Sequence, residues 1–248
     1  MAVQEEQVAS DAKARFEALD QKLKATWKDV LEHSKLVHAI ERGTIDKRLY
    51  ALYLLETYQY TLHNARNQAL VGVRAISENG PYLKFCFEHA SEEAGHELMA
   101  LHDLLSLGGL KREDFEVPPP LPATEVLIGY LYWISATGNP LRRLGYSYWA
   151  ENSYHYINPL ITHVQRTLQL KPAQMTFFVS HARIDEEHAL QVRKMIAQNC
   201  KREADWRDVE QVMVTSLRLT GGMMEAVHTE YERLMAGEPS PYTFLNAL

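Results

Sequence analysis

Residues 180–188 read Ser-His-Ala-Arg-Ile-Asp-Glu-Glu-His, and no other stretch of the chain constrains the fold as strongly. His181, Asp185 and His188 are spaced i, i+4 and i+7. An α-helix turns by about 100° per residue, so these side chains fall within roughly 60° of one another on one face. Two imidazoles and a carboxylate on one stripe suit iron, with manganese and zinc as competitors. A polar helix face in contact with water is the alternative, and nearby apolar residues such as Ile184 weigh against it.

The helical periodicity continues through nearly the whole chain, without strand-type alternation or an Asn-Gly hairpin between β-branched runs. Glycine, proline and capping residues divide the chain into about seven helical segments, which predicts an all-α fold. The expected segments are 10–42, 46–78, 82–107, one with Thr124 as its N-cap, one starting at Pro140 and kinked at Asn158-Pro159, 172–199, and 204–236 with a loosened turn at Gly221-Gly222.

The length of 248 residues fits one large domain or two small ones. One clear loop, residues 111–122, carries three consecutive prolines. The apolar faces on either side of this loop are too incomplete to be covered separately. We therefore expect a single domain over 1–248, with the loop on its surface and a flexible, turn-rich tail at 237–248.

Composition excludes several classes of protein. The net charge of −6 would repel a polyphosphate, which argues against a nucleic-acid partner. Residues 1–10 lack the basic start and apolar stretch of a secretory signal, and the most apolar window, 126–136, is too short to span a bilayer. Two cysteines, Cys86 and Cys200, do not make a disulfide framework. These features predict a soluble cytoplasmic protein without a membrane partner.

A second motif, Phe-Glu-His-Ala-Ser-Glu-Glu-Ala-Gly-His-Glu, occupies residues 87–97. Glu93 and His96 form Glu-x-x-His, a spacing used in helical bundles that hold two metals. Glu92 and His96 form the competing i, i+4 pair. Gly95 has no side chain and would let another backbone approach. Alone this motif is weak, because acidic helices with histidine are common on surfaces, but it gains weight beside the first motif.

Glu56 and Glu151 each lie in an aromatic and apolar stretch, where a charged group is costly unless something compensates it. A metal dication would compensate it; alternatively, each carboxylate simply points to water. The complete candidate set comes from four helices and suits two metals, with carboxylates to bridge and imidazoles to terminate. Its members are Glu56, Glu93, His96, Glu151, His181, Asp185 and His188.

In this order the motifs resemble those of the heme-oxygenase-like di-iron oxidases. That family carries a Glu on one helix, Glu-x-x-His on the next, often a Glu on a middle helix, and His-x3-Asp-x2-His on a later one. The resemblance covers about residues 45–200. Its His-x3-Asp-x2-His element is fairly specific, whereas the single glutamates are not. The matching elements here are Glu56, Glu93-x-x-His96, Glu151 and His181-x3-Asp185-x2-His188.

The resemblance implies a single-domain, seven-helix heme-oxygenase-like (TenA/PqqC-like) bundle with two Fe(II) ions between the helices, the second of them readily lost. It also implies O2 as co-substrate, an external electron donor and a small-molecule substrate. Similar family members oxidise amino acids, amines or fatty acids by N-oxygenation, desaturation or oxidative C–C cleavage. We expect a biosynthetic non-heme di-iron oxidoreductase acting on an amino acid or amine, with fatty-acid oxidative decarboxylation as an alternative.

Two other functions stay open. A ferroxidase or iron store would use similar ligands but needs a cage or an iron exit route, and the aromatic residues near Glu56 and Glu151 favour a substrate pocket instead. A metal-free enzyme on the same scaffold is compatible with the fold alone. A metal-free site, however, has no reason to gather three histidines and four carboxylates at these spacings.

Further residues have weaker signals. Tyr60 and His63 follow Glu56 by four and seven residues, and His155 follows Glu151 by four, so each could orient its glutamate through a hydrogen bond. Ordinary packing is the alternative for all three.

Arg66, Arg142 and Arg143 could hold a substrate carboxylate, and the sequence does not choose among them. His89 and Cys86 lie on the Glu93 side of their helix. The aromatic residues between 130 and 156 could wall a cavity, fill the core or cover the interface of a homodimer.

Overall fold

In the computed structural model, the backbone is described for residues 2–75 and 79–248, and the side chains of residues 2–11, 114 and 180–186 lie outside the described part. The described backbone forms eleven α-helices and four short 3₁₀ helices and contains no strand, which confirms the all-α prediction. None of these helices is both long and apolar enough to cross a lipid bilayer.

The α-helices occupy nearly the whole chain, and short turns connect them. In chain order they are α1 (Ala2–His33), α2 (Lys35–Glu41), α3 (Lys47–Thr61), α4 (Asn64–Arg74), α5 (Gly80–Glu93), α6 (Glu97–Ser106), α7 (Pro122–Ala136), α8 (Leu144–Ala150), α9 (Tyr154–Leu168), α10 (Thr176–Asn199) and α11 (Glu203–Met235). The 3₁₀ helices are η1 (Arg112–Asp114), η2 (Pro140–Arg143), η3 (Pro172–Gln174) and η4 (Thr243–Ala247).

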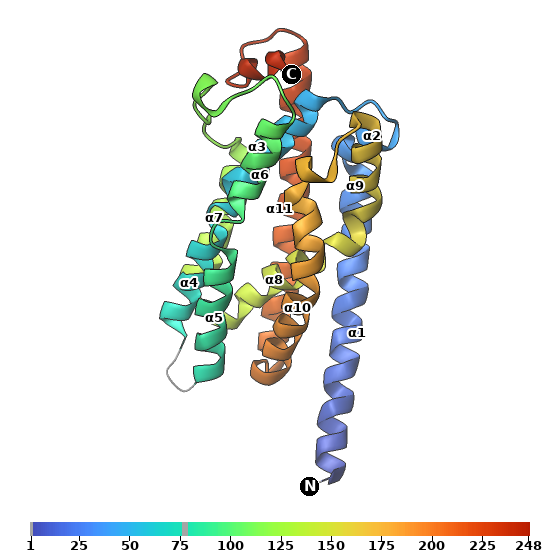
Figure 1. Ribbon diagram of the computed structural model, residues 1–248. Coiled ribbons are helices and arrows are strands. Elements are labelled where there is room, and N and C mark those ends of the chain that lie inside the picture. The colour runs from blue at the N-terminus through green and yellow to red at the C-terminus, as the bar shows by residue number, and fades with distance from the viewer. Residues whose placement is uncertain (1, 76–78) are drawn as a thin grey trace.

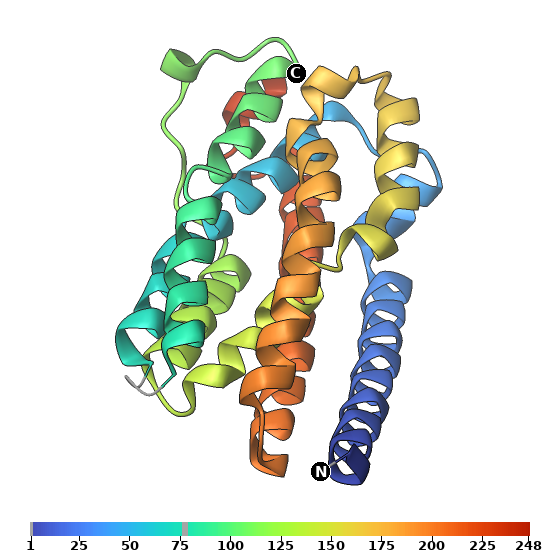
Figure 2. The same cartoon turned by 60° about the horizontal axis from the view of Figure 1, so that its bottom comes forward.

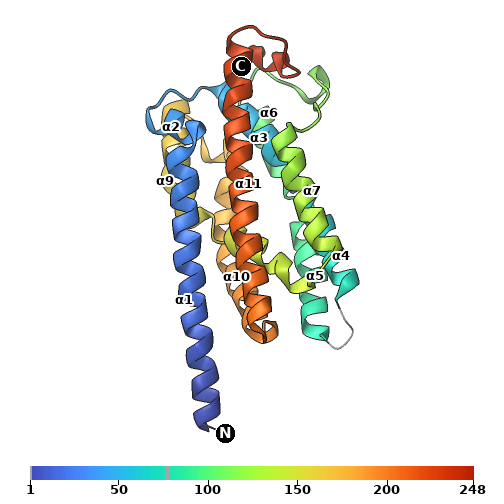
Figure 3. The ribbon, with the colours of Figure 1, turned by 180° about the vertical axis from the view of Figure 1, so that it is seen from behind.

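Helix α11 runs along the middle of the bundle and packs against α1, α3, α7 and α8 (Figure 3). The pairs α4 with α5 and α3 with α6 form one side, and α9 lies beside α2 on the other (Figure 1). Helix α10 contacts α6, α8 and α9 and so connects the two sides. The N-terminal end of α1 lies at the opposite end of the bundle from the C-terminus (Figure 2).

The expected helical segments are divided further by capping residues. The expected segment 10–42 breaks at Ser34, whose side chain accepts a hydrogen bond from the Val37 amide and caps α2. The expected segment 46–78 breaks after Thr61, and Asp46 caps its first half through the Leu49 amide. These polar residues satisfy amides that a helix leaves without partners at its start, so the breaks are locally favourable.

The expected helix 82–107 is broken between Ala94 and His96, which corrects the prediction of one continuous element. Gly95 has a φ of +98° there, a conformation that favours glycine. A Cβ atom at this position would meet no other atom within 4 Å. The glycine therefore permits the turn between α5 and α6, and the expected close backbone approach is not its role.

Two other expected breaks are also displaced. The chain turns at residues 151–153, between α8 and α9, whereas Pro159 lies inside α9. Helix α11 continues through Gly221 and Gly222, and Gly221 lies against Val30 of α1. A Cβ at Gly221 would lie 3.0 Å from a Val30 methyl carbon, so this glycine serves helix packing instead of loosening the helix.

Glu56 ties the proline loop and the C-terminal residues to α3. Its buried carboxylate accepts hydrogen bonds from the Leu121 amide at 2.9 Å, the Thr124 hydroxyl at 2.5 Å and the Tyr242 hydroxyl at 2.8 Å. Thr124 therefore bonds to Glu56 and does not cap α7. Tyr242 and Leu245, which belong to the segment expected to be a flexible tail, are fully buried.

Helices α8 and α11 cross closely at Gly145. A Cβ atom there would overlap the Val209 carbonyl oxygen and lie 2.8 Å from the Met213 amide nitrogen. Both atoms belong to the backbone of α11 and cannot move aside as a flexible side chain would. Since residue 151 follows α8 by one residue, this contact also fixes where Glu151 can lie.

We predict that Gly145→Ala lowers the free energy of unfolding by about 1–3 kcal/mol or more, because the added methyl group overpacks a backbone contact. Urea denaturation followed by far-UV circular dichroism measures this change. Gly129→Ala is the matched control, since a Cβ on this helical glycine meets no atom within 4 Å. If the Gly145→Ala protein proved as stable as the Gly129→Ala protein, the close crossing would be contradicted.

Candidate metal centre

Four buried side chains gather where α5, α8 and α10 meet. They are His89 and Glu93 of α5, Glu151 at the end of α8 and His188 of α10. One ligand atom of each lies within 4.8 Å of one ligand atom of every other. All four residues are at most 9% exposed. Burying two carboxylates and two imidazoles away from water costs free energy unless their charges are compensated.

Glu151 lies between the two imidazoles. Its Oε1 is 3.2 Å from His89 Nε2, and its Oε2 is 3.3 Å from His188 Nδ1. Glu93 Oε1 lies 3.9 Å from His188 Nδ1, and the rings of His89 and His188 have their centroids 4.9 Å apart. Oxygen and imidazole-nitrogen donors therefore alternate around one small volume.

The pKa values show how these groups share charge. Burial would raise the pKa of Glu151, but hydrogen bonds and charge from His188 and His89 outweigh it and lower the pKa to about 2. Burial would lower the pKa of His188, but the Glu151 carboxylate outweighs it, with help from Glu93 and Glu92, and raises the pKa to about 9. Without a metal, a protonated imidazole thus supplies the positive charge that the carboxylates require.

His96 and Glu92 border the cluster. His96 Nδ1 lies 3.3 Å from Glu93 Oε1, and Glu92 Oε2 lies 3.1 Å from His188 Nε2. The Glu92 side chain is 49% exposed, whereas that of Glu93 is 11% exposed. Of the two neighbouring glutamates, Glu93 faces the buried cluster, and Glu92 approaches His188 at its other nitrogen.

His181 and Asp185 lie outside the residues whose side chains the structure describes. Their backbone belongs to α10, the same helix as His188. Their part in the metal site therefore remains a prediction from their spacing.

The remaining sequence candidates lie elsewhere. The structure does not bring Glu56 to the cluster, and three hydrogen-bond donors account for its burial without a metal. His63 Nδ1 is 3.0 Å from the Tyr132 hydroxyl, and His155 is exposed. Tyr60 lines a cavity that reaches the cluster.

His89 belongs to the cluster, although the predicted ligand set did not include it. The sequence placed His89 only on the Glu93 side of its helix. The missed signal is a repeated spacing. His89-x3-Glu93-x2-His96 has the same pattern as His181-x3-Asp185-x2-His188. A helix places residues at i, i+4 and i+7 on one face, and the first pattern follows one helix only as far as Glu93, the last residue of α5. The chain then turns, and His96 is the N-cap residue of α6.

The donor set fits iron. Imidazole nitrogen with carboxylate oxygen is a combination that non-heme iron sites use. His89 Nδ1 is buried and has no hydrogen-bond partner among the described residues, so this nitrogen is left for a ligand or an ion. Several buried ligands from three helices would also hold an ion with few water molecules.

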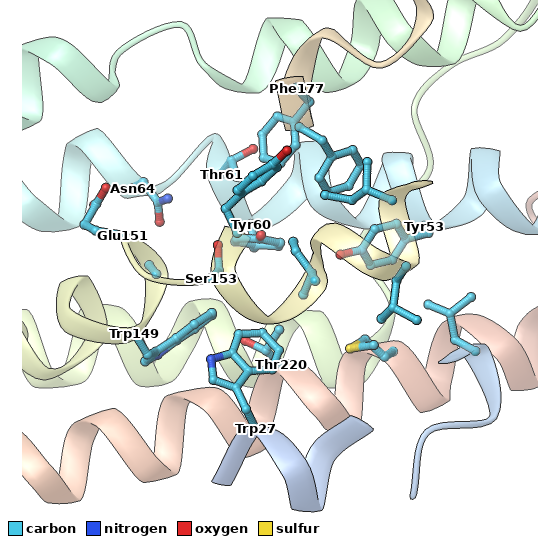
Figure 4. A pocket seen from close by; sticks show the side chains of 18 of the residues that line it. Trp27, Tyr53, Tyr60, Thr61, Asn64, Trp149, Glu151, Ser153, Phe177 and Thr220 are labelled. Carbon is cyan, nitrogen blue, oxygen red and sulfur yellow. The ribbon is translucent and has the colours of Figure 1, made fainter. Parts of the chain in front are cut away.

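A cavity of about 150 Å³ opens onto the cluster, because His89, Glu93 and Glu151 are part of its lining. Asn64 and Glu151 lie at one end of the view in Figure 4 and Tyr53 lies at the other. Tyr60, Thr61 and Ser153 lie between the two ends. An organic molecule in this cavity would therefore lie next to the candidate metal ligands.

The fold has known relatives. A crystal structure from Shewanella denitrificans, described as a domain of unknown function with a heme oxygenase-like fold, is 51% identical. It has a TM-score of 0.86 over 90% of this chain and 95% of that chain. A TenA homologue from P. horikoshii is 18% identical, with a TM-score of 0.68 over 86% and 97%. A TenA homologue from Pseudomonas syringae is 13% identical, with a TM-score of 0.68 over 87% and 93%. The last two likenesses show the fold alone.

Among curated proteins, no sequence matches this chain significantly. Residues 51–221 match the sequence model of a family described as iron-containing redox enzymes. The matched range contains the whole buried cluster and both copies of the repeated spacing. The resemblance drawn from the sequence is thereby confirmed for family and fold. This chain, with its heme-oxygenase-like bundle, belongs to the iron-containing redox enzyme family.

Proposed function

We propose that this protein is a non-heme di-iron oxidase, which uses O2 to oxidise a small organic molecule held in the cavity. The observation that carries the proposal is the repeated His-x3-acid-x2-His spacing, which offers two similar donor sets. One copy contributes His89 and Glu93 to the buried cluster, and the other contributes His188. Glu151 lies between them and is suited to bridge two ions.

In this proposal, His89, Glu93 and His96 would hold one iron and His181, Asp185 and His188 the other. When bound, the two ferrous ions would supply electrons to O2 and activate it. The cavity wall would orient the substrate beside the ions and keep water away from them. Glu56 would act as a structural clamp on the loop and C-terminal residues, because its carboxylate is already satisfied.

An iron-storing function would need no organic substrate. The cavity argues against it, since most of the side chains that line it are apolar or aromatic and it reaches the cluster. Iron storage is therefore the alternative function, and the reaction with O2 can distinguish it from an oxidase.

Anaerobic loading with ferrous iron should give about two ions per chain in the wild-type protein. We predict that His89→Ala lowers the iron content by at least half, because it removes a donor from the buried cluster. Iron per chain is measured by a colorimetric assay after gel filtration. His63→Ala is the matched control, since this histidine contacts Tyr132 and not the cluster. Full loading of the His89 variant would rule out this assignment.

The reaction with O2 should distinguish an oxidase from an iron-storing ferroxidase. We predict that the iron-loaded protein gives a transient visible absorption after mixing with O2 in a stopped-flow instrument. The transient should decay faster with one member of a panel of amino acids, amines and carboxylic acids. Iron oxidation that continues far beyond two ions per chain, without any effect of organic compounds, would indicate a ferroxidase.

Metal binding should depend on pH through His188. Its pKa of about 9 means that the ring is protonated at neutral pH, so an ion must displace this proton. We predict that the apparent affinity for Fe(II) falls by up to about tenfold for each unit of pH decrease below pH 9, because one more proton must leave. Anaerobic titration at several pH values measures it. An affinity that does not change with pH would show that His188 binds no metal.

A further inference from the structure

Several polar side chains in the cavity wall are already hydrogen-bonded within the protein. The Tyr146 hydroxyl donates to Asn64 Oδ1 at 3.1 Å, and Trp149 Nε1 donates to Ser216 Oγ at 2.8 Å. The Thr220 hydroxyl donates to the Ser216 carbonyl oxygen at 3.1 Å. These groups need nothing from a ligand, because the bundle itself supplies their acceptors.

Two other polar side chains in the wall, Trp27 and Tyr50, lack such partners. They are 3% and 2% exposed. Trp27 Nε1 and the Tyr50 hydroxyl oxygen are buried and have no hydrogen-bond partner among the described residues. A buried donor without an acceptor costs free energy, so most native proteins pair such groups. Since both residues line the cavity, a molecule inside it could supply the missing acceptor.

The Trp27 ring is fixed by aromatic contacts that offer it no lone pair. It stacks on Tyr156 with ring centroids 5.4 Å apart and meets the edge of Trp149 at 5.8 Å. In Figure 4 its side chain extends from α1 toward the middle of the cavity, beside Thr220 and apart from Glu151. The indole nitrogen can only donate a hydrogen bond. Trp27 is therefore a donor held in place at a distance from the metal cluster.

The Tyr50 hydroxyl is the second unused donor. Burial raises the pKa of Tyr50 well above its ordinary value, and the nearby Asp103 carboxylate raises it further, so the hydroxyl keeps its proton. Asp103 does not accept this proton. Its oxygens accept from the Thr176 amide and hydroxyl and from the Phe177 amide. The Asp103 charge also disfavours a second negative charge near Tyr50, so the acceptor that suits this hydroxyl is uncharged.

The one arginine among the described residues of the cavity wall does not change this conclusion, and no lysine is present among them. Arg143 donates to Asn67 Oδ1 at 2.9 Å and to Ser147 Oγ at 2.8 Å. The carboxylates of Glu151 and Glu93 favour its charged form. Arg143 is thus compensated within the protein and does not require an anionic ligand.

The remaining wall suits an apolar molecule. Helices α2 and α9 contribute aliphatic side chains, among them Leu36, Ile40, Ile157, Leu160, Ile161 and Val164. A plain hydrocarbon chain would fill this space but would leave both donors unpaired. A site with buried hydrogen-bonding groups discriminates strongly against an analogue that lacks the matching group.

We propose that the cavity selects an organic molecule whose apolar body carries an uncharged hydroxyl or carbonyl oxygen, which accepts hydrogen bonds from Trp27 Nε1 and the Tyr50 hydroxyl. Whichever group of that molecule faces the cluster, these two donors make Trp27 and Tyr50 specificity-determining residues. They select against an unsubstituted alkyl chain. The binding step stands without the proposed function, but the oxidation of the ligand rests on it.

Isothermal titration calorimetry of the anaerobic, iron-loaded protein tests the two donors. The probes are acetophenone and α-methylstyrene, which has a methylene group in place of the ketone oxygen. Tyr50→Phe and Trp27→Phe should each weaken acetophenone binding by about two- to tenfold, because each removes one hydrogen bond. The binding of α-methylstyrene should not weaken. An unchanged acetophenone affinity in either variant would overturn the assignment of that donor, and an equal loss of both probes would mean a structural role only.

Matched controls come from an aromatic pair outside the cavity wall whose donors have partners. The Tyr82 hydroxyl donates to the Pro140 carbonyl oxygen, and Trp206 Nε1 donates to the Cys200 carbonyl oxygen, each at 2.9 Å. Tyr82→Phe and Trp206→Phe should leave the affinity for both probes unchanged.

Urea denaturation checks that the Tyr50 hydroxyl is unused by the fold. Tyr50→Phe should keep or raise the urea midpoint, because it removes a buried group without a partner, whereas Tyr82→Phe should lower it. A midpoint that falls as far for Tyr50→Phe as for Tyr82→Phe would show that the protein already satisfies this hydroxyl, and the proposal would fail.

If a variant does not fold, the wild-type protein still decides. The infrared carbonyl stretch of bound, ¹³C-labelled acetophenone should lie at lower frequency than in hexane, both before and after iron is added, because hydrogen bonds weaken the C=O bond. A stretch at the hexane frequency would show that no donor reaches the oxygen.

Iron is counted on the same samples. A protein that takes up iron but binds acetophenone without the two donors would refute the ligand class alone. A protein that binds acetophenone through them but takes up no iron would refute the proposed function alone.

Discussion

The buried contact of Glu151 with His89 and His188 is the constraint around which the bundle is arranged. Two carboxylates and two imidazoles cannot share a volume without water unless positive charge compensates them. In the absence of metal, the pKa of about 9 for His188 shows that a proton meets this need. Since the four residues come from α5, α8 and α10, the bundle must hold three helices in register to keep the charges together. The close crossing of α8 and α11 at Gly145 is part of that requirement.

The two glutamates of the cluster occupy helix ends. Glu93 is the last residue of α5, and Glu151 directly follows α8. A turn follows each of them, and the first requires the positive φ of Gly95. The direction of a side chain at a helix end does not depend on the direction of the next helix. Helices α6 and α9 can therefore run away from the cluster at angles of their own. The same turns explain why the predicted segments 82–107 and that starting at Pro140 each contain an extra break.

The sequence predicts the helical class and places His181, Asp185 and His188 on one helix, because these features depend on spacing along one helix. The common stripe of the three side chains stays a prediction, since those of His181 and Asp185 lie outside the described part. The breaks at Ser34, after Thr61, at Gly95 and at residues 151–153 were not predicted. It cannot separate Glu56 from Glu151. Both lie in aromatic stretches, and their partners are distant in sequence: Tyr242 for Glu56, and His89 for Glu151. Only packing shows that hydroxyl and amide donors satisfy the first glutamate while imidazoles face the second. His89 was within reach of the sequence, since its spacing to Glu93 and His96 repeats that of the other motif.

Charge balance links the metal site to the cavity. Arg143 lines the same cavity as Glu93 and Glu151, and its hydrogen-bond partners are neutral. Burial lowers the pKa of Arg143, whereas the Tyr146 and Tyr82 side chains and the carboxylates of Glu151 and Glu93 favour its charged form. Without a metal, the guanidinium and the protonated ring of His188 therefore both offset the charge of these two carboxylates. An ion that binds the cluster must displace the His188 proton while the charge of Arg143 stays in place, and like charges repel.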